Sequence, residues 1–587
     1  MTERFSDDLS LGQPRFQDAA LAAVAQAQGT AAAWRLAFSR GDAAAMQAAR
    51  QAGGDFAVAV STAADGAAGP APSAFLAVDR FAIRTLCYRV EGGRLRWAER
   101  ADALADPPVS DRAVHDGLDP QAIFDYLYFH AIPSPRTVFA GVQRLPPGHC
   151  AIWRDGTLSV APYWQPAFAE ARAPSFKALR DEFRALLEIA VARQLAGDAG
   201  KPACFLSGGT DSSTVAGTIG LVTARAGGPP AASYSIGFDA AGYDEMAWAR
   251  LAAQHFGTAH HERYVTPEDL VRQIGPVARH HDQPFGNSSA LPAFLCAEMA
   301  AADGVTRLLA GDGGDELFGG NARYAQQRLF GWYDRVPAPL RERLLQPLLS
   351  QPAAARLTLL RKGASYIEQA RVPLPDRLQM YNLLRRIGVD RVLTPEFIAR
   401  IDAGEPTRAQ RDVWARSTGA SAGVSAAANP SELNRMLAFD WRYTLAESDL
   451  PKVNGAAQMA GIAVGFPLLD TDLLDFSLRL PSDYKLKGQR LRWFFKEALR
   501  GFLPDEIIAK KKQGFGLPFG VWVLRHPPLH ALASDSLRSL AGRGIVRPDF
   551  IRSLLDTLLP AHPGYYGEMV WVLTVLEQWL RGRSSGD

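Results

Sequence analysis

The sequence contains few of the residues that form covalent cross-links or soft metal sites. Only 4 of its 587 residues are cysteine and 11 are histidine. Cys87, Cys150, Cys204 and Cys296 are widely spaced, and no two of them form a C-x-x-C pair. The sequence therefore predicts neither a disulfide framework nor a zinc site.

An excess of one charge and long hydrophobic runs are also missing. The formal net charge of +3 is nearly neutral for this length. It therefore gives no indication that the protein binds a nucleic acid or a membrane surface. No run of eighteen apolar residues occurs, and the acidic and basic residues of the first eight positions do not form a signal-peptide pattern. We therefore expect a cytoplasmic protein, and the sequence leaves its oligomeric state open.

The composition is that of a globular chain, with 47% hydrophobic and 21% charged residues. Its length alone would suggest about three or four domains at roughly 150 residues each. No internal repeat is evident. The positions of the motifs described next favour two domains, of which the second is large.

The most informative segment is residues 205–213, F-L-S-G-G-T-D-S-S, which follows the apolar run 203–206. The run suits a buried strand, and a helix is expected from about Thr214. Two adjacent glycines allow a tight turn whose amides can surround a phosphate, and Asp211 supplies an oxygen ligand for Mg²⁺. The predicted nucleotide-binding residues here are Leu206, Ser207, Gly208, Gly209, Asp211, Ser212 and Ser213.

A second glycine-rich string, residues 311–320, follows another strand-like segment at 308–310. Its carboxylates, Asp312, Asp315 and Glu316, lie among so many glycines that the string suits neither a core segment nor a helix. Alone it could be an acidic surface turn. Together with Asp211, these carboxylates are predicted to hold Mg²⁺ between phosphates.

At these two strings the chain resembles the asparagine synthetase family, whose synthetase domains carry S-G-G-x-D-S-S and a later G-[DE]-G-[GSA]-D-E-x-F-G-G. Further segments resemble family signatures in the same order, and the similarity covers most of residues 54–320 and 440–525. No signature falls between 325 and 435. These further segments are 235–238, 243–245, 257–261, 282–285, 288–290, 466–470 and 512–518.

The resemblance implies an α/β synthetase domain over residues 175–587, with a parallel sheet of the pyrophosphate-loop type and helical additions at its C-terminus. It also implies adenylation, in which ATP activates a carboxylate, pyrophosphate leaves, and an amine then displaces AMP to form an amide. By the same resemblance, Asp211 and Asp315 are the Mg²⁺ ligands. The resemblance adds Ile236, Gly237, Gly311 and Asp312 to the residues that bind ATP.

Two catalytic roles follow from the same resemblance. Lys512 matches the lysine that stabilises the adenylate and the tetrahedral intermediate in relatives. Asp312 stands where asparagine synthetases commonly carry Glu and β-lactam synthetases carry Tyr, a position associated with the incoming amine. A carboxylate there could accept a proton from an ammonium nucleophile. The neighbouring basic run 510–512 is otherwise expected to be a solvated face.

Residues 1–165 are predicted to be a degenerate, truncated domain of the class II glutamine amidotransferase type, which is an α+β Ntn-like remnant with an antiparallel β sandwich. Residues 54–60, 75–88 and 93–100 have the patterns of strands and a hairpin, whereas the Ala-rich residues 15–53 suit helices. Small-residue stretches predict a hairpin loop at 63–72 and the interdomain connection at 161–174.

The glutaminase chemistry of that domain is expected to be absent. Its nucleophile is an N-terminal cysteine, whereas Met1 is followed here by Thr2 and the first cysteine is Cys87. The R-G-P-D and N-G-E segments that bind glutamine have no counterpart before Gly54. The domain is therefore interpreted as a remnant kept for packing or for binding a partner.

Without internal ammonia, the amine must come from a substrate or from free ammonia. The leading interpretation is a lasso-peptide-type macrocyclase, for which a precursor peptide and its processing protease are expected partners. A β-lactam synthetase-like enzyme, a saccharide- or metabolite-amidating enzyme, an asparagine synthetase that uses glutamine or ammonia, and a non-catalytic scaffold remain open alternatives.

Two departures from the family pattern bear on the substrate. Gly465 replaces an arginine before Phe466, and Asn454 and Gly455 replace the last two residues of K-V-D-R. Loss of a guanidinium removes an anchor for a carboxylate, which argues against free aspartate as substrate. The small-residue run 419–429 is predicted to be a loop over the substrate mouth.

Overall fold

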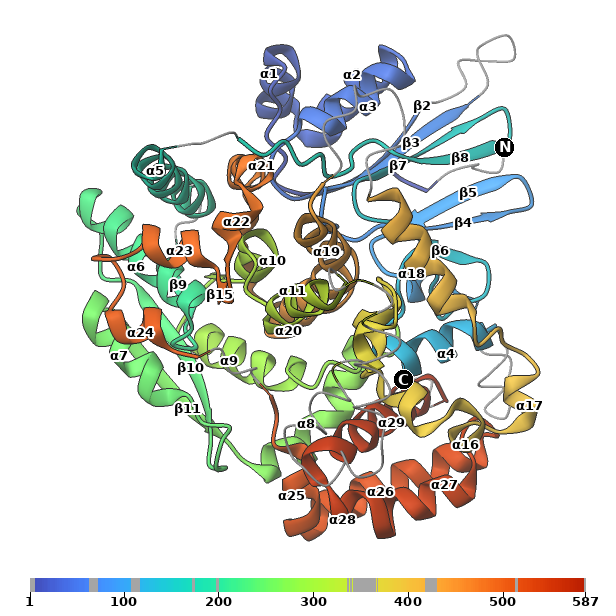
Figure 1. The fold of residues 1–587 in the computed structure, drawn as a ribbon. Coiled ribbons are helices and arrows are strands. Elements are labelled where there is room, and N and C mark those ends of the chain that lie inside the picture. The colour runs from blue at the N-terminus through green and yellow to red at the C-terminus, as the bar shows by residue number, and fades with distance from the viewer. Residues whose placement is uncertain are drawn as a thin grey trace.

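The computed structural model describes residues 6–584 except 63–71, 107–116, 172–174, 197–199, 335–336, 338–339, 341–365, 367, 418–429 and 512–515. In the described ranges the N-terminal part contains two antiparallel sheets, and the part that follows contains a five-stranded parallel sheet among helices (Figure 1). Both sheet types agree with the predicted fold classes.

The two antiparallel sheets form the predicted sandwich. The five-stranded sheet has the order β1-β2-β3-β7-β8 and the three-stranded sheet has the order β5-β4-β6. The strands are β1 (Leu9–Gly12), β2 (Phe56–Thr62), β3 (Ser73–Val78), β4 (Cys87–Glu91), β5 (Arg94–Ala98), β6 (Val142–Arg144), β7 (His149–Arg154) and β8 (Thr157–Pro162). Before residue 165 the sequence predicted strands only within 54–60, 75–88 and 93–100, so β1, β6, β7 and β8 were not predicted.

Alternation along β2 explains how its sheet is buried on both faces. Phe56, Val58 and Val60 share a core with the helices, whereas Ala57 and Ala59 face the smaller sheet. Successive side chains of a strand point to opposite faces, so one strand serves both layers. The helices are α1 (Ala19–Gln28), α2 (Thr30–Ser39) and α3 (Asp42–Gln51), which confirms the helical prediction for residues 15–53.

The parallel sheet has the strand order β11-β10-β9-β12-β13, and every pairing in it is parallel. Its strands are β9 (Ala203–Phe205), β10 (Ala232–Phe238), β11 (Ala259–Val265), β12 (Arg307–Leu309) and β13 (Ala463–Gly465). From β9 the chain adds strands on one side and then returns to add β12 and β13 on the other. The strand order therefore reverses between β9 and β12, where open α/β sheets bind ligands beyond their carboxyl ends.

Helices cover both faces of this sheet. One core contains α5 (Phe176–Leu195), α6 (Thr210–Arg225) and α7 (Met246–Phe256), and another contains α9 (Ala290–Ala302). Because both faces are covered, the central strand β9 and the end of β12 are short apolar runs, whereas the edge strand β11 is mainly polar. This is the pattern from which the sequence predicted the strands before both glycine-rich strings.

A third core joins the C-terminal helices to α4 (Pro120–Phe129) and α8 (Pro267–His280). The C-terminal helices are α25 (Phe519–Arg525), α26 (Pro527–Gly542), α27 (Pro548–Ser553), α28 (Leu559–Ala561) and α29 (Pro563–Ser584). α4 therefore packs on the synthetase side although it precedes residue 165. The division of the chain at 165 and 175 stays a prediction.

The stretch 325–435, for which no signature was predicted, is helical in its described parts. Its elements, with the helices that follow it, are α11 (Ala322–Asp334), α15 (Leu383–Ile387), α16 (Val389–Val392), α17 (Pro395–Ile398), α18 (Glu405–Arg416), α19 (Glu432–Asp440), α20 (Leu450–Met459), α21 (Thr471–Arg479), α22 (Ser482–Lys485), α23 (Trp493–Ala498) and α24 (Asp505–Ala509). The predicted loop 419–429 lies outside the described residues, as does most of the predicted hairpin loop 63–72.

Buried ion pairs join the N-terminal segments to the synthetase side. Glu447 is 4% exposed, accepts hydrogen bonds from the Ser134 N–H (3.1 Å) and Oγ (2.7 Å), and forms ion pairs with Arg144 and Arg442. Arg15 reaches Asp470 at 2.7 Å. These contacts fix α4 and the following turn relative to the parallel sheet.

The interdomain connection leaves β8 at Pro162, one residue after the predicted start, and contacts a buried lysine. Lys485 is completely buried, donates to Asn434 Oδ1 at 3.0 Å, and lies 4.9 Å from the ring centre of Phe168. Asn434 Nδ2 in turn donates to Glu170 Oε1 at 2.7 Å. Burial lowers the pKa of Lys485 to about 7.

This burial predicts a specific pH dependence of stability. The unfolded chain protonates Lys485 with an ordinary pKa of about 10.4, so between pH 7 and 10 it binds more protons at this residue than the folded chain does. The free energy of unfolding should therefore gain up to about 1.4 kcal/mol per pH unit in this window from Lys485. Lys485→Met should remove that gain, which urea unfolding of both proteins at several pH values measures. Parallel pH profiles for the two proteins would contradict the prediction.

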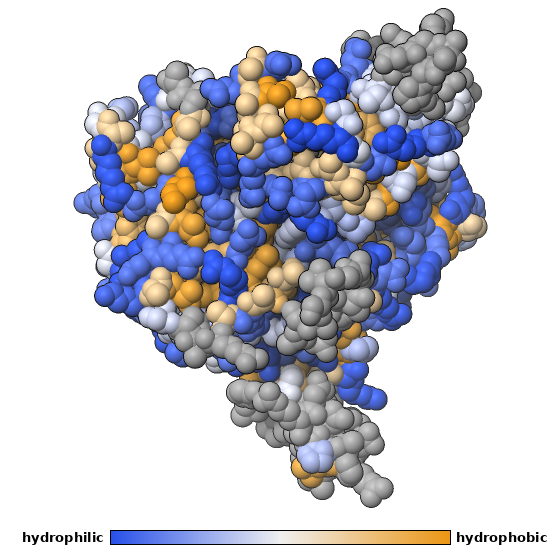
Figure 2. Space-filling model, turned by 90° about the horizontal axis from the view of Figure 1, so that it is seen from above, coloured by the Kyte–Doolittle hydropathy of each residue, from blue (hydrophilic) through white to orange (hydrophobic). Residues whose placement is uncertain are grey.

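The surface is mainly hydrophilic on the face that Figure 2 shows, with hydrophobic residues in small groups rather than in one continuous patch. Among the described residues, no helix combines the length and apolar character that a membrane crossing requires.

Candidate active site

The first glycine-rich string turns tightly between β9 and α6. Gly208 has φ +66°, and a Cβ there would lie 2.3 Å from the backbone carbon of Trp248, so only glycine fits. Ser212 Oγ accepts from the Ser207 N–H at 3.2 Å and lies 3.0 Å from Ser207 Oγ. The loop therefore directs backbone amides and hydroxyls toward the start of α6, the arrangement that binds phosphate oxygens.

The helix after this loop begins earlier than expected. α6 starts at Thr210, not near Thr214, with Gly209 as its N-cap. Asp211 and Ser212 thus lie on the first turn, where the helix dipole favours a negative charge and free backbone N–H groups can bind an anion. The sequence placed these residues in a loop because small polar residues mask a helix start.

The second string packs directly against the first. A Cβ on Gly311 would lie 2.7 Å from the Ser212 nitrogen, and one on Gly314 would lie 2.5 Å from Asp211 Oδ1. Residues 314–318 form a short helix, α10, although the string was expected to suit no helix. The positive φ of +98° at Gly313 starts this turn after β12, and the turn places Asp315 on its inner side.

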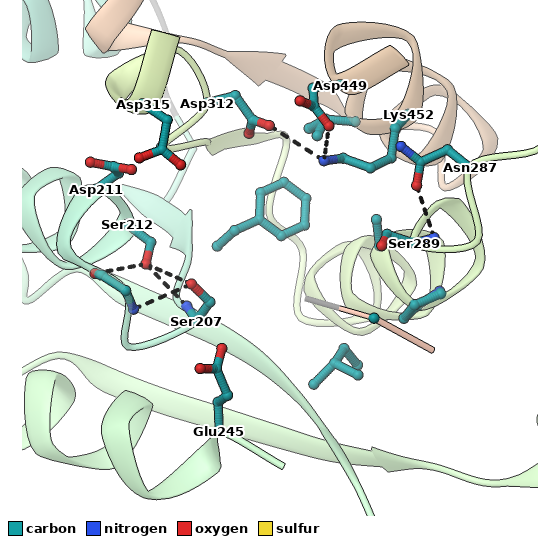
Figure 3. A pocket seen from close by; sticks show the side chains of 18 of the residues that line it. Ser207, Asp211, Ser212, Glu245, Asn287, Ser289, Asp312, Asp315, Asp449 and Lys452 are labelled. Carbon is teal, nitrogen blue, oxygen red and sulfur yellow. Dashed lines mark hydrogen bonds and ion pairs between the residues drawn. The ribbon is translucent and has the colours of Figure 1, made fainter. Parts of the chain in front are cut away.

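Asp211 and Asp315 converge on a single cationic atom. Arg492 Nη1 lies 2.6 Å from Asp211 Oδ1 and 2.9 Å from Asp315 Oδ1. Figure 3 shows the two carboxylates facing each other beside the phosphate loop. The two predicted metal ligands therefore lie close enough together to reach one ion.

These carboxylates fit Mg²⁺, because hard oxygen ligands in small number suit an ion that retains waters and bridges phosphates. In the part of the chain that the structure describes, no cluster of three or more His, Cys, Asp or Glu could enclose a metal ion. Asp211 and Asp315 would thus hold Mg²⁺ jointly with the nucleotide, not in an all-protein cage. Binding of Mg²⁺ and ATP stays a prediction.

Arg492 is the main member of the site that the sequence analysis missed. It is 6% exposed and adopts a left-handed backbone conformation, with φ +51°. Burial by itself lowers its pKa, but the charges of Asp211 and Asp315 outweigh burial and raise it. Because Arg492 lies 281 residues from Asp211 in the chain, no local pattern links the two.

A second charged group lies across the pocket. Lys452 Nζ lies 3.0 Å from Asp449 Oδ1 and 3.5 Å from Asp312 Oδ1 (Figure 3). Burial raises the pKa of Asp312, and Lys452 opposes this effect in part. Asp449 ends a π-helical segment, η6 (Trp441–Asp449), and such segments are frequent at functional sites.

The residues that depart from the family pattern lie elsewhere. Asn454 Nδ2 donates to the Ile83 carbonyl at 2.8 Å, and a Cβ on Gly455 would lie 2.5 Å from the His281 ring. A Cβ on Gly465 would lie 2.4 Å from Gln194 Oε1. None of the three lines the pocket. Close neighbours therefore account for glycine at 455 and 465, and the argument against aspartate stays a prediction.

The basic run 510–512 is not simply a solvated face, as its first member shows. The Lys510 side chain is 9% exposed, lies 2.9 Å from Glu245 Oε1, and donates to the Gly208 carbonyl at 3.3 Å. Lys510 lines the pocket, so the expectation of a solvated face is wrong there. Lys512, the predicted catalytic lysine, lies outside the described residues.

The charged groups described above open onto one cavity of about 720 Å³; they are Asp211, Asp312, Asp315, Asp449, Lys452, Arg492 and Lys510. Gly208, Ser213 and Gly237 of the predicted nucleotide site lie behind its lining: Ser213 is fully buried, and Gly237 packs on Tyr264 and Asp244. The predicted residues that do line the cavity are Leu206, Ser207, Gly209, Asp211, Ser212, Ile236, Gly311, Asp312, Asp315 and Glu316.

Other lining residues come from segments that the sequence did not connect with the site. Phe129 and His130 end α4, and Glu568 belongs to α29. Ser288 and Ser289, in contrast, belong to 288–290, a segment that resembles a family signature. Asp282 of the signature 282–285 accepts from the Ala101 N–H at 2.9 Å and does not line the cavity.

Comparison with known proteins agrees with this geometry. The sequence profile of the family described as asparagine synthase matches residues 182–581, and that of a glutamine amidotransferase domain matches residues 42–164. The protein called asparagine synthetase [glutamine-hydrolyzing] 1 of Bacillus subtilis is 23% identical over 502 residues, which cover 85% of this chain and 74% of that protein.

Two further relatives carry similar names. Asparagine synthetase [glutamine-hydrolyzing] 3 of the same bacterium is 25% identical over 82% of this chain and 70% of its own length. Asparagine synthetase [glutamine-hydrolyzing] of Brassica oleracea is 32% identical over 30% of this chain and 31% of its own length. Because the synthase profile spans well over half of its length, this chain belongs to the asparagine synthase family.

Proposed function

We propose that the chain is an ATP-dependent ligase that adenylates a carboxylate, releases pyrophosphate and then joins the acyl group to an amine. The observation that supports this most directly is the convergence of Asp211 and Asp315 on one cationic atom, beside a phosphate-type loop at the strand-order reversal. A scaffold that only bound a ligand would not need two partly buried carboxylates there.

The residues present suit the charge problem of this reaction. A carboxylate attacking the α-phosphate brings two anions together, and Mg²⁺ bound by Asp211 and Asp315 would supply the neutralising charge. The amides of the loop at Ser207–Gly209 orient the phosphates. Lys512 stays a proposed stabiliser of the developing charge, by resemblance alone.

The amine step requires a proton acceptor. An ammonium group must first lose a proton, because only the neutral amine has a lone pair. When the amine attacks the acyl carbon, the bond from that carbon to the AMP oxygen breaks, the amide bond forms, and a second proton leaves the nitrogen. Asp312 suits proton acceptance because burial raises its pKa while Lys452 holds its carboxylate in place.

The decisive experiment is exchange of labelled pyrophosphate into ATP with candidate carboxylic acids and Mg²⁺. Exchange that depends on an acid would support the proposal. No exchange with any acid from amino acids to peptides would favour the scaffold alternative instead.

We also propose that this chain takes no ammonia from glutamine. All four cysteines are buried, and burial raises the pKa of Cys150 to about 11 and those of the other three thiols further. A nucleophilic thiol must be accessible and ionised, so none of them suits glutaminase chemistry.

The expected result is that glutamine releases no glutamate above background when it is incubated with the protein, with or without ATP. An amino-acid assay of glutamate over hours measures this, and a glutaminase added to a parallel sample verifies the assay. Glutamate release that follows the protein through purification would overturn the remnant interpretation.

The amine is then proposed to belong to a substrate. Joining a peptide's amino terminus to one of its own Asp or Glu side chains remains the leading case, with a precursor peptide and its processing protease as proposed partners. β-Lactam-type closure and amidation of a saccharide or metabolite are the alternatives. Mass spectrometry of candidate peptides tests the leading case, because macrocyclisation removes one water per molecule.

A further inference from the structure

The α4 and α29 part of the cavity lining carries a histidine–glutamate pair that the proposed reaction has not used. His130 Nδ1 lies 3.3 Å from Glu568 Oε1, and the side chains are 27% and 41% exposed. Both residues line the same cavity as Asp211 and Asp315. In Figure 1, α4 and α29 lie apart from α6, so the pair does not belong to the phosphate loop.

We propose that Glu568, held by His130 and flanked by Phe129, binds the ammonium group of the amine substrate. This inference rests on the proposed ligase function and adds to it the place and the chemical class of the second substrate, which is a cationic primary amine.

The charges of the lining support this assignment. Asp211 and Asp315 face Arg492, Asp312 and Asp449 face Lys452, and Glu245 faces Lys510. Among the described residues, Glu568 has His130 as its only ion-pair partner and faces no lysine or arginine. Because the His130 ring lies against Oε1, the other carboxylate oxygen of Glu568 can accept a hydrogen bond from a cation.

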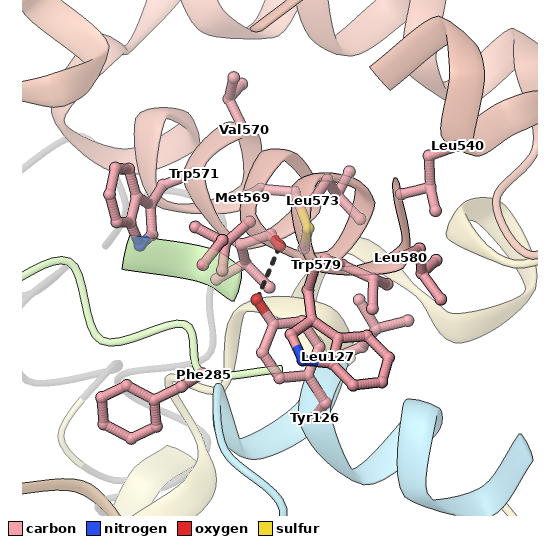
Figure 4. Close-up of a cluster of buried hydrophobic side chains, with 14 of the residues drawn as sticks. Tyr126, Leu127, Phe285, Leu540, Met569, Val570, Trp571, Leu573, Trp579 and Leu580 are labelled. Atoms are coloured by element: carbon pink, nitrogen blue, oxygen red, sulfur yellow. Dashed lines mark hydrogen bonds between the residues drawn. The ribbon is translucent and has the colours of Figure 1, made fainter. Parts of the chain in front are cut away.

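The pair is held in place by a short chain of hydrogen bonds. The Gly286 N–H donates to the His130 carbonyl at 2.8 Å, and the Gly286 carbonyl accepts from Trp571 Nε1 at 3.0 Å. Tyr126 Oη donates to the Val572 carbonyl at 2.8 Å, a bond drawn in Figure 4. Glu568 is one turn before Trp571 and Val572 on α29, so it lies on the helix face fixed against α4.

The backbone of His130 supports the same conclusion. His130 has φ +62°, and its N–H donates to the Tyr126 carbonyl at 2.7 Å, which ends α4. A non-glycine residue is uncommon in this conformation and persists where the surroundings fix it. A Cβ on Gly286 would lie 3.3 Å from that of His130, so the two turns are in close contact.

Aromatic rings complete the site. Phe129 stacks on Tyr443 with a centroid distance of 5.5 Å and an interplanar angle of 16°, and Tyr243 also lines the cavity. A carboxylate beside aromatic faces is the combination that binds an ammonium group on an apolar stem. A segment inside the amidotransferase-like region therefore contributes to the synthetase cavity, which gives that region a role other than glutamine hydrolysis.

Binding of benzylammonium and of benzyl alcohol to the full chain tests the inference, with a non-hydrolysable ATP analogue and Mg²⁺ present. The two probes have nearly the same shape and differ in charge. We expect the wild type to bind benzylammonium at least tenfold more tightly than the alcohol in an NMR titration. Glu568→Gln should abolish this preference and leave binding of the alcohol unchanged.

Glu268→Gln is the matched control, because Glu268 also pairs with a histidine, His526 at 2.9 Å, but does not line the cavity. It should retain the preference. A wild type without the preference, or a Glu568→Gln protein that keeps it, would overturn the inference. Binding of the nucleotide analogue, followed in the same samples, tests the proposed function separately, so failure of one is distinguishable from failure of the other.

Discussion

Asp211→Asn and Asp315→Asn are each expected to reduce ATP–pyrophosphate exchange by about 10³-fold, because each removes one of the two negative charges that would hold Mg²⁺ against the phosphates. Asparagine keeps the size of the side chain, so the glycine contacts around Asp211 remain possible. The readout is exchange of labelled pyrophosphate into ATP at a saturating concentration of the carboxylic acid substrate, with the Mg²⁺ concentration varied over several decades.

The Mg²⁺ dependence separates metal binding from damage to the fold. Each variant also removes a partner of the buried Arg492, so thermal unfolding must be measured alongside. If the carboxylates hold the ion, the variants need far more Mg²⁺ to reach half of their remaining rate. Asp472→Asn is the matched control, since Asp472 pairs with Arg193 at 2.7 Å outside the cavity. Exchange that stays within tenfold of the wild type in both variants would refute the metal assignment.

The resemblance to the family singled out this pair of carboxylates, and the strands before them explain why the two side chains lie together. Each follows a short apolar strand, and carboxyl ends of neighbouring parallel strands meet at one edge of a sheet. The glycines of both strings mark places where backbones approach too closely for a side chain, as at Gly208 and Gly311. Local pattern and sheet topology together thus determine where Asp211 and Asp315 lie.

The partners of these carboxylates could not be predicted in the same way. Arg492 and Lys452 reach the cavity through tertiary packing, and their ion pairs span 281 and 140 residues of sequence. Lys510 was expected to be solvated because three consecutive lysines usually are, yet burial against Glu245 makes it part of the lining. His130 and Glu568 meet only because α4 packs on α29.

Lys452→Met is expected to lower the free energy of unfolding by about 3 kcal/mol, because it leaves Asp312 and Asp449 without a counter-charge in a largely buried position. The charges of Asp449 and Asp312 outweigh burial and raise the pKa of Lys452, so this lysine is charged at neutral pH. Urea unfolding at pH 7 measures the loss. Lys201→Met, at an exposed lysine, should change stability by less than about 0.5 kcal/mol.

A second substitution tests whether charge is the cause. Adding Asp449→Asn to Lys452→Met removes one of the two uncompensated carboxylates, so the double variant should be more stable than Lys452→Met alone. The same double variant should still exchange pyrophosphate into ATP, since Asp211 and Asp315 are intact, while amide formation falls because Asp312 has lost the lysine that holds it. A double variant no more stable than the single one would show that Lys452 acts by packing, and Asp312 would then have no charged partner to fix it for proton transfer.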